Sequence, residues 1–483
     1  MLTKTQEEAL RLLKTGANVF LTGKAGTGKS FVLKEFIRQS KKKILITAPT
    51  GVAAIEIGGA TLHRTFGIPM DMSKLVKDIR IKKPKKNPVV AADVVIIDEI
   101  SMVRRDIFEY VMRYIQEVNW KHRKGRAPIQ VILVGDFFQL PPVLTPGDVE
   151  AYKMLMGNLD IYPFESSYWW QFDFQKIELL EVMRQKDDGD FLDNLNRIRN
   201  GDVSAIDYFN KRVREDYKTT KGINIVPTNA KVRRLNNENL LRLNTKKRIY
   251  KAEKSGSVKP SDIVNDEELL LKIGAKVMIT TNHPMLEYSN GSLGTVKEFH
   301  KDSVDVQLLG SHKVVEIERK RNVISEYVVE DDLITLREVG FYSQIPLKIA
   351  YAITVHKSQG KTFDEVHLDP SVWSDGQLYV ALSRVTSIKG LTLSEPIQPS
   401  AVKVSEDVLR FYGYEIGEDV DVEEIERRTK EEIIANFGIL ESIISSYLES
   451  DGEGEELLAR FPNVANLAEV LERLKDIKPI IED

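Results

Sequence analysis

The chain has 483 residues, a formal net charge of −3 and no cysteine. Its length exceeds what a single hydrophobic core supports, so we expect about two to four domains. The absence of cysteine excludes disulfides, iron–sulfur clusters and thiolate zinc sites, and the seven histidines show no metal-ligand spacing. No run of about eighteen apolar residues occurs and residues 1–6 show no secretory pattern, so we expect a soluble cytoplasmic protein.

The charge is unevenly distributed along the chain. Residues 413–483 carry about 20 acidic and about 7 basic side chains, a net charge of roughly −13, which leaves the remainder at roughly +10. A basic body suits the neutralisation of phosphates that nucleic-acid binding requires. We interpret the acidic tail as a solvated helical appendage; a shielding or recruiting role is the alternative.

Short β-branched runs alternate with helical periodicity through the first 175 residues, which predicts a parallel α/β sheet. The expected strands are residues 18–21, 44–47, 94–97 and 130–134. We expect Trp120, Trp169 and Trp170 to pack in the core, because bulky aromatic side chains usually bury their area.

A glycine-rich loop, Gly23–Ser30, follows the first strand and precedes a helical pattern. Its spacing, Gly-x4-Gly-Lys-Ser, is typical of a loop whose backbone N–H groups cradle phosphates at a helix N-terminus. Lys29 would reach the β- and γ-phosphates of a nucleoside triphosphate, and the Ser30 hydroxyl would hold Mg²⁺. The other loop residues assigned to the nucleotide are Gly23, Gly26, Thr27 and Gly28.

A polar stretch, residues 66–87, separates the second and third strands and ends in a lysine-rich run at 81–86. It belongs to an insertion at about 64–90. We interpret it either as a DNA-facing excursion or as a solvated surface loop.

The third strand ends in two carboxylates, Asp98 and Glu99, at the edge where open α/β sheets bind ligands. We expect Asp98 to help hold Mg²⁺ and Glu99 to polarise the attacking water. The fourth strand runs into residues 135–143, where Gln139 suits sensing of the γ-phosphate or positioning of water. A turn built around two prolines is the alternative for this segment.

Further motifs occur along the chain, in this order from the N-terminus to the C-terminus. They are Gln6 ahead of the phosphate loop, then residues 47–54, 60–66, 181–185, 191–201, 353–362 and 379–385. With them, residues 1–412 resemble a superfamily-one DNA helicase of the Pif type (petite integration frequency), which is related to RecD. Val52 stands where RecD-like chains typically carry arginine, which favours the Pif type.

The resemblance implies two RecA-like lobes with ATP between them. Gln6 would recognise adenine, and Gly360 would permit close backbone approach. Arg184 and Arg384 would present cations to the γ-phosphate, with a structural ion pair as the alternative for each. The residues implied in DNA binding are Pro49, Thr50, Thr61, His63, Phe66, Thr228, His356 and Lys357. Hydroxyls, backbone amides and a stacked aromatic ring suit a grip on any sequence.

The predicted fold class is α/β, with two RecA-like parallel-sheet lobes, a small inserted β-barrel and a helical C-terminal appendage. The first lobe would span 1–175 and the second 176–283 and 346–412, with 225–229 and 277–280 among its strands. Alternating residues and Asn-Gly turn chemistry place the barrel at 284–345. Residues 413–483 form the appendage.

The resemblance implies an ATP-dependent DNA helicase that uses Mg²⁺ and moves 5′ to 3′ along single-stranded DNA, in replication, repair or recombination. The expected partners are single-stranded DNA, junctions of single- and double-stranded DNA and, as a further candidate, G-quadruplex DNA. We expect a monomer associated with the nucleoid. Two alternatives are a RecD-like translocase subunit of a larger complex and a nucleotide-gated DNA-binding switch with slow hydrolysis.

Overall fold

The computed structural model describes residues 2–69, 75, 79, 81, 83–145, 147–182, 188–214, 222–259, 263, 265–283, 287–311, 313–330 and 333–414. The predictions for Arg184, for most of residues 70–82 and for the appendage beyond 414 lie outside these residues. The chain divides into two compact units, one of residues 1–146 and 160–411 and one of residues 147–159 and 412–483. In the second unit, helix α7 (Val149–Met156) is described. Within the described part, no helix has the length and apolar character needed to cross a membrane.

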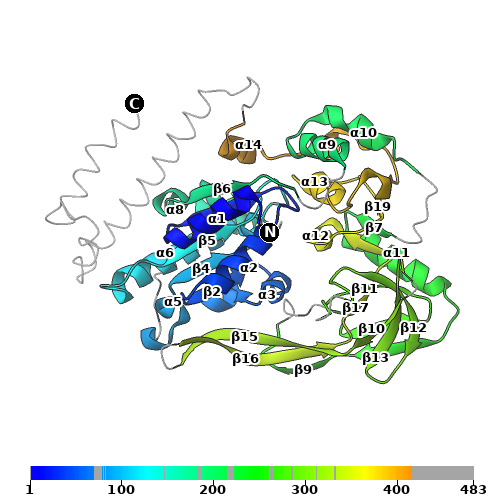
Figure 1. Cartoon of the computed structure of the whole chain (residues 1–483), viewed down its shortest axis with the longest axis horizontal. Coiled ribbons are helices and arrows are strands. Elements are labelled where there is room, and N and C mark those ends of the chain that lie inside the picture. The colour runs from blue at the N-terminus through cyan, green and yellow to red at the C-terminus, as the bar shows by residue number, and fades with distance from the viewer. Residues whose placement is uncertain are drawn as a thin grey trace. The chain divides into compact units, whose positions relative to one another are not determined.

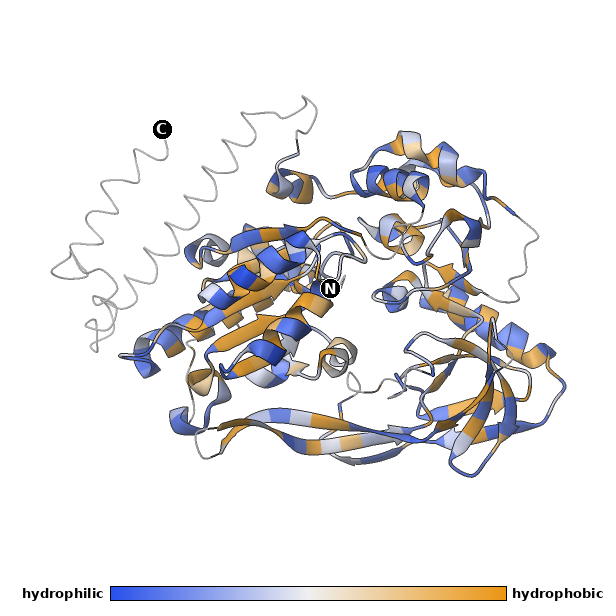
Figure 2. Cartoon of the chain, in the orientation of Figure 1, coloured by the Kyte–Doolittle hydropathy of each residue, from blue (hydrophilic) through white to orange (hydrophobic). Residues whose placement is uncertain are grey.

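A six-stranded parallel sheet forms the N-terminal part of the first unit (Figure 1). Its strand order is β3 (Ala60–Thr61), β2 (Ile44–Ala48), β4 (Val94–Ile97), β5 (Gln130–Val134), β1 (Val19–Gly23) and β6 (Gln175–Leu179). The four strands predicted from the sequence are confirmed. Every residue of β1, β4 and β5 is buried, as expected for central strands that are covered on both faces. Figure 2 shows these strands as predominantly hydrophobic.

Helices cover this sheet. They are α1 (Lys4–Thr15), α2 (Lys29–Gln39), α3 (Gly51–Ile57), α4 (Leu62–Phe66), α5 (Pro88–Ala91), α6 (Arg105–His122) and α8 (Ser167–Gln171). Thr3 and Gln6 form a capping box that begins α1, and Gly16, at φ 93°, ends it. The apolar faces of α1 and α2 share one core with β1 and β4, which fixes the phosphate loop between β1 and α2.

The tryptophans divide between core and surface. Trp169 is 4% exposed and packs among the rings of Phe20, Phe137 and Phe411, so its predicted place in the core is confirmed. Trp120 and Trp170 are 56% and 70% exposed, so the same prediction was wrong for them. Ring size alone does not tell which side of a helix faces the sheet.

A second parallel sheet has the strand order β18 (Ala352–Thr354), β7 (Ile223–Val226), β19 (Val366–Leu368) and β20 (Leu391–Leu393). Its helices are α9 (Gly189–Arg199), α10 (Ile206–Asn210), α11 (Asn229–Arg242), α12 (Val355–Ser358) and α13 (Gln377–Leu382), and α14 (Glu406–Tyr412) follows. The core of this second sheet includes Ala25 of the phosphate loop and Leu140, which follows β5. The two sheets therefore meet at the phosphate loop.

Antiparallel strands lie between β7 and β18 in the sequence. One pair joins β8 (Lys247–Lys251) to β10 (Glu268–Lys272). A five-stranded sheet has the order β14 (Val314–Glu318), β13 (Ser303–Leu308), β12 (Leu293–Phe299), β11 (Lys276–Ile279) and β17 (Leu347–Ile349). Both groups share one hydrophobic core.

The strand expected at 277–280 was assigned to the wrong sheet. It is β11, which pairs antiparallel with β12 and β17 rather than joining the second parallel sheet. A short apolar run is equally compatible with a parallel and an antiparallel strand, so periodicity could not separate them. The antiparallel strands thus extend beyond 284–345 on both sides.

A long hairpin, β15 (Lys320–Glu330) and β16 (Leu333–Gln344), pairs at its base with β9 (Glu253–Gly256). It runs from the antiparallel sheets to the N-terminal parallel sheet (Figure 1). There the Tyr327 hydroxyl accepts a hydrogen bond from Ile46 N at 3.1 Å and lies 3.3 Å from Ile46 O, to which it donates. Because β3 pairs only with Thr47 and Ala48, this contact satisfies the part of the β2 edge that β3 leaves open.

Candidate functional site

The phosphate loop is shaped by glycines and braced from α1. Gly28 precedes α2 with a left-handed backbone (φ 86°), and a Cβ there would lie 2.6 Å from Gln6 Nε2. Only glycine fits both conditions. Gln6 is 4% exposed, and its Nε2 donates to Thr27 O at 3.0 Å. In this structure Gln6 therefore holds the loop that would receive phosphates.

Lys29 opens α2 and turns back onto the loop. Its Nζ donates to Gly23 O at 2.6 Å and to Lys24 O at 3.3 Å. Burial lowers the pKa of Lys29, and the carboxylates of Asp136 and Glu99 act in the opposite direction. The ammonium is thus held by carbonyl dipoles within the field of nearby carboxylates. Ser30 follows it and is exposed.

The two carboxylates follow β4, whose neighbour β5 lies beside β1. Asp98 is 8% exposed, and its Oδ1 accepts a hydrogen bond from Glu99 N at 2.9 Å. Glu99 has φ 51° and ψ 46°, a left-handed backbone that costs a non-glycine residue about 1–3 kcal/mol. Strain of this kind concentrates at functional sites, which supports a functional reading of Glu99.

The segment after β5 contains a buried ion pair. Asp136 and Arg199 are 1% and 2% exposed, and Arg199 Nη2 lies 3.0 Å from Asp136 Oδ1. Arg199, on α9, also stacks over the Phe138 ring. The other carboxylate oxygen of Asp136 accepts a hydrogen bond from Gln139 Nε2 at 3.4 Å. Arg199, which lies beside the second sheet, therefore holds the segment that contains Gln139, the predicted γ-phosphate sensor.

Two residues beside the second sheet reach the site, and sequence reasoning assigned a role to neither. Gln359 Nε2 lies 3.3 Å from both Glu99 Oε2 and Gln139 Oε1. Ala25 N, in the phosphate loop, donates to the Tyr379 hydroxyl at 3.1 Å. Both residues fall inside motifs that the sequence singled out, but residue type alone did not distinguish them from their neighbours.

Arg384 is 1% exposed and bonds to backbone carbonyls of its own lobe. Its Nε donates to Val380 O at 2.7 Å, and its Nη1 lies 3.3 Å from Ser358 O and 3.2 Å from Lys361 O. In this structure it braces the loop that contains Gly360, which is exposed at φ 78°. A contact of Arg384 with a γ-phosphate requires these bonds to rearrange.

Three of the predicted DNA-binding threonines share one local structure. Each lies at the end of a strand or within two residues after it, and its hydroxyl caps the next helix. The Thr50 hydroxyl accepts from Ala53 N at 3.2 Å, that of Thr61 from Arg64 N at 3.3 Å and that of Thr228 from Lys231 N at 3.1 Å. Thr354 does the same for Lys357 N at 3.2 Å. It was missed, although strand, threonine and helix follow one another there too. His356 and Lys357, on the helix that Thr354 caps, are exposed.

The remaining DNA-binding predictions differ in exposure. Pro49 and His63 are half-buried. Burial lowers the pKa of His63, and the nearby charges of Lys259 and Arg104 lower it further. Phe66 is 2% exposed and packs edge-on against Tyr114, with 5.4 Å between ring centroids. The structure places Phe66 in the core, where it has no face to offer a base, so it does not enter the DNA-binding set.

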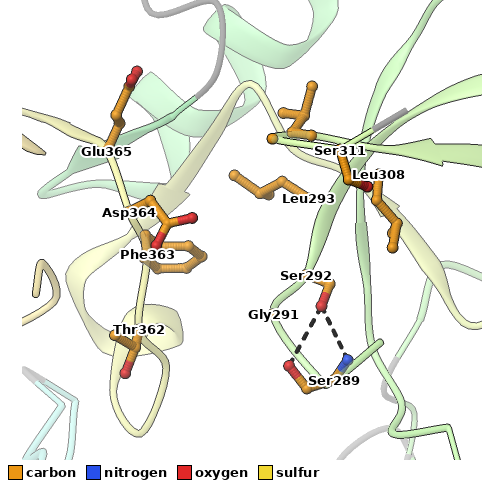
Figure 3. Close-up of a pocket in the computed structure, with 12 residues that line it drawn as sticks. Ser289, Gly291, Ser292, Leu293, Leu308, Ser311, Thr362, Phe363, Asp364 and Glu365 are labelled. Atoms are coloured by element: carbon orange, nitrogen blue, oxygen red, sulfur yellow. Dashed lines mark hydrogen bonds between the residues drawn. The ribbon is translucent and has the colours of Figure 1, made fainter. Parts of the chain in front are cut away.

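A cavity of about 500 Å³ lies elsewhere (Figure 3). It is lined by residues 308–311, by Thr362–Glu365 and by Ser289, Gly291, Ser292 and Leu293. Beside it, Lys361 Nζ donates to Asn290 Oδ1 at 2.8 Å. Its lining residues include none of the predicted site residues, so the cavity is separate from the phosphate loop.

A phosphate loop, a carboxylate pair and a glutamine follow adjacent strands of one parallel sheet, and residues beside a second parallel sheet contact all three. This arrangement defines a two-lobed nucleoside triphosphatase of the RecA-like kind. The PIF1-like helicase family model matches residues 1–208.

Comparison with known proteins narrows the class further. The ATP-dependent DNA helicase Pif1 of Bdellovibrio bacteriovorus is 33% identical over 426 residues, which cover 85% of this chain and 91% of that protein. Pif1 of Campylobacter jejuni is 30% identical over 84% of this chain and 97% of its own length. The crystal structure of Bacteroides Pif1 with ADP-AlF4 has a TM-score of 0.77 at 31% identity, covering 85% and 96% of the two chains. The chain belongs to the PIF1-like helicases, and it is an ATP-hydrolysing DNA helicase.

Proposed function

We propose that this chain moves 5′ to 3′ along single-stranded DNA and opens duplex DNA ahead of it, driven by Mg²⁺-dependent ATP hydrolysis. The observation that carries the proposal is the bridge from Gln359 to Glu99 and Gln139, because Gln359 lies two residues beyond Lys357. One short segment thus contains residues proposed for DNA binding and a residue that contacts two of the groups proposed for ATP chemistry.

The residues present fit ATP and Mg²⁺. Backbone N–H groups of the loop and Lys29 would bind the phosphates, and Gln6 would recognise adenine. The Ser30 hydroxyl and the Asp98 carboxylate supply the hard oxygen ligands that Mg²⁺ prefers, and few protein ligands are typical of such sites. The metal would neutralise charge on the β- and γ-phosphates. The full nucleotide set is Gln6, Gly23, Gly26, Thr27, Gly28, Lys29, Ser30 and Gly360.

The chemical step divides among Glu99, Gln139 and the arginines. Glu99 would accept a proton from the attacking water, and Gln139 would sense the γ-phosphate. Arg384 would stabilise transition-state charge after domain closure frees it from carbonyls, and Arg184 is proposed for the same role on sequence grounds. An arginine in this role is worth about 10³–10⁵ in rate in other phosphate-loop enzymes.

DNA would be held by its phosphates. Helix-capping threonines, with backbone N–H groups beside them, offer sequence-independent contacts. We assign this role to Pro49, Thr50, Thr61, His63, Thr228, Thr354, His356 and Lys357. A Bacteroides Pif1 structure bound to single-stranded DNA is similar to this chain at 32% identity and a TM-score of 0.60, which supports the assignment. Junctions and G-quadruplexes are the substrates proposed beyond single strands.

The parts outside the two parallel sheets would assist this motor. We infer that the antiparallel strands between Lys247 and Ile349 close into a small barrel that braces the DNA channel. Their single shared core supports this inference. The acidic residues beyond 412 would form the helical appendage.

The direct test is ATP-dependent unwinding of two matched partial duplexes, one with a 5′ single-stranded tail and one with a 3′ tail. We expect only the 5′-tailed duplex to open. Glu99→Gln keeps the size of the side chain but removes the base, so unwinding and hydrolysis should fall by about 10²-fold or more while DNA binding persists.

Other outcomes would favour the alternatives. DNA-stimulated hydrolysis without unwinding of either duplex would favour a translocase subunit that awaits its partner. Slow hydrolysis at saturating DNA would favour a nucleotide-gated switch. Opening of the 3′-tailed duplex alone would reverse the proposed direction.

A further inference from the structure

Gln359 occupies a position that the roles proposed above leave unused. It follows α12 and precedes Gly360, and its carboxamide extends to the N-terminal sheet. There its Nε2 lies 3.3 Å from an oxygen of Glu99, the proposed base, and 3.3 Å from the side-chain oxygen of Gln139, the proposed sensor. The carboxamide therefore lies between the two groups that must flank the attacking water.

The other end of this carboxamide is an acceptor in need of a donor. Gln359 Oε1 is buried and makes no hydrogen bond to the part of the chain that the structure describes. Buried polar atoms in native proteins are nearly always satisfied, so this acceptor, at a site of chemistry, is suited to a donor that arrives during function. Water is the smallest such donor. Because Glu99 accepts only one of its hydrogens, the second is available to Gln359.

We propose that Gln359 is a catalytic residue that positions the attacking water; this rests on the proposed function. Gln359 Oε1 accepts one hydrogen of the water while Glu99 accepts the other. The water oxygen forms a bond to the γ-phosphorus as the bond from that phosphorus to the bridging oxygen breaks. The electron pair of the broken bond leaves with ADP, and the proton taken by Glu99 passes to inorganic phosphate. The Nε2 bond to Gln139 orients the carboxamide.

The same residue would make hydrolysis depend on DNA. Gln359 ends α12, and its backbone N–H donates to His356 O at 3.3 Å. His356 and Lys357 are the exposed side chains of that helix proposed to contact DNA, and Thr354 caps its other end. A displacement of this four-residue helix by DNA moves Gln359 directly. DNA would thereby place the carboxamide for catalysis.

The test compares Gln359→Ala with wild type in steady-state ATP hydrolysis at saturating single-stranded DNA. We expect kcat to fall by about 10²-fold, as for the loss of one positioned polar group, with the KM for ATP and the affinity for DNA changed less than about threefold. Gln398→Ala is the matched control, since Gln398 is exposed and belongs to the same lobe. It should hydrolyse ATP at the wild-type rate.

Two further measurements separate catalysis from structure. ADP with aluminium fluoride mimics the transferring phosphoryl group, so Gln359→Ala should lose affinity for it by about 10²-fold while its affinity for ADP alone is unchanged. Gln359→Asn keeps the carboxamide but withdraws it by one methylene from Glu99 and Gln139. Its kcat should fall nearly as far as that of Gln359→Ala, although a polar group remains in the site.

The outcomes distinguish this inference from the proposed function. If wild type hydrolyses ATP, Glu99→Gln does not, and Gln359→Ala stays within threefold of wild type, the role of Gln359 is overturned while the helicase proposal stands. Equal losses of ADP and aluminium fluoride complex affinity would mean a structural role and would also overturn it. A wild-type chain without DNA-stimulated hydrolysis would overturn both.

Discussion

Glu99 combines a charged side chain with a strained backbone. Its left-handed conformation lets the chain turn sharply after β4, and its N–H is held by the preceding carboxylate, Asp98. Two acidic groups are thereby fixed in adjacent positions before any nucleotide binds. A preorganised base needs little rearrangement during reaction, which is the physical advantage that offsets the strain.

Glu165 is a buried carboxyl group with a clear pH consequence. Burial raises its pKa to about 8 from the ordinary 4.5, and the charges of Asp160 and Asp407 add to the effect. Because the folded state binds this proton more tightly, the contribution to stability is complete below about pH 4.5 and is lost as the pH rises to about 8. Glu165→Gln keeps an acceptor for Tyr162 N and removes the ionisation.

We therefore expect Glu165→Gln to raise the melting temperature at pH 8.5, by the equivalent of about 1–2 kcal/mol, and by less at pH 6. Thermal unfolding followed by circular dichroism at the two pH values measures this difference. Glu395→Gln, at an exposed site, should show no such pH-dependent gain. An equal gain at both pH values would contradict the prediction.

Sequence patterns predicted residues whose chemistry depends on local spacing. The phosphate loop and the carboxylates after β4 lie where their strands end, because the chain itself sets these positions. Gln359 and Tyr379 were missed because their contacts with Glu99 and Ala25 join residues more than 200 positions apart. Such contacts arise from the packing of two sheets, which residue spacing does not encode.

At the scale of elements, the β15–β16 hairpin is the main feature that periodicity did not foresee. Its apolar residues occur in short runs without strict alternation, and the sequence indicates neither its length nor its target. The target exists because β3 is only two residues long, so Ile46 lacks a strand partner on that side. One tyrosine hydroxyl then serves both the donor and the acceptor of Ile46.

We expect Tyr327→Phe to leave the fold intact but to loosen this contact. The Ile46 amide would lose its acceptor, a change worth about 1–2 kcal/mol locally. Hydrogen exchange of the β2 peptide should become about tenfold faster or more, and Tyr208→Phe on α10 is the matched control. Unchanged exchange in β2 would show that the hairpin does not protect it.

At the scale of the whole first unit, side chains link the two parallel sheets through the phosphate site. Arg199 bonds to Asp136, Asp136 to Gln139, and Gln139 through Gln359 to Glu99. Tyr379 adds a direct bond to the phosphate loop. We expect a nucleotide on the loop to change some of these bonds, which would couple its binding to movement of the sheets.

We expect the Lys29→Ala variant to lose ATP hydrolysis but to keep its affinity for DNA. The variant lacks the ammonium that would bind the β- and γ-phosphates, so hydrolysis should fall by at least about 10³-fold. The proposed DNA contacts lie on other segments, so the affinity for single-stranded DNA should stay within about threefold. Fluorescence anisotropy with labelled DNA and a phosphate-release assay measure the two quantities. Retained DNA-stimulated turnover would overturn the assignment of the loop.

The open edge of β2 has a consequence outside catalysis. Free main-chain groups at a sheet edge are a template on which a second molecule can add a strand. By occupying Ile46, the tip of the hairpin removes part of that template. A variant without the tip should therefore first show self-association and a low yield of folded protein. In the molecules that have not associated, ATP hydrolysis should be unaffected.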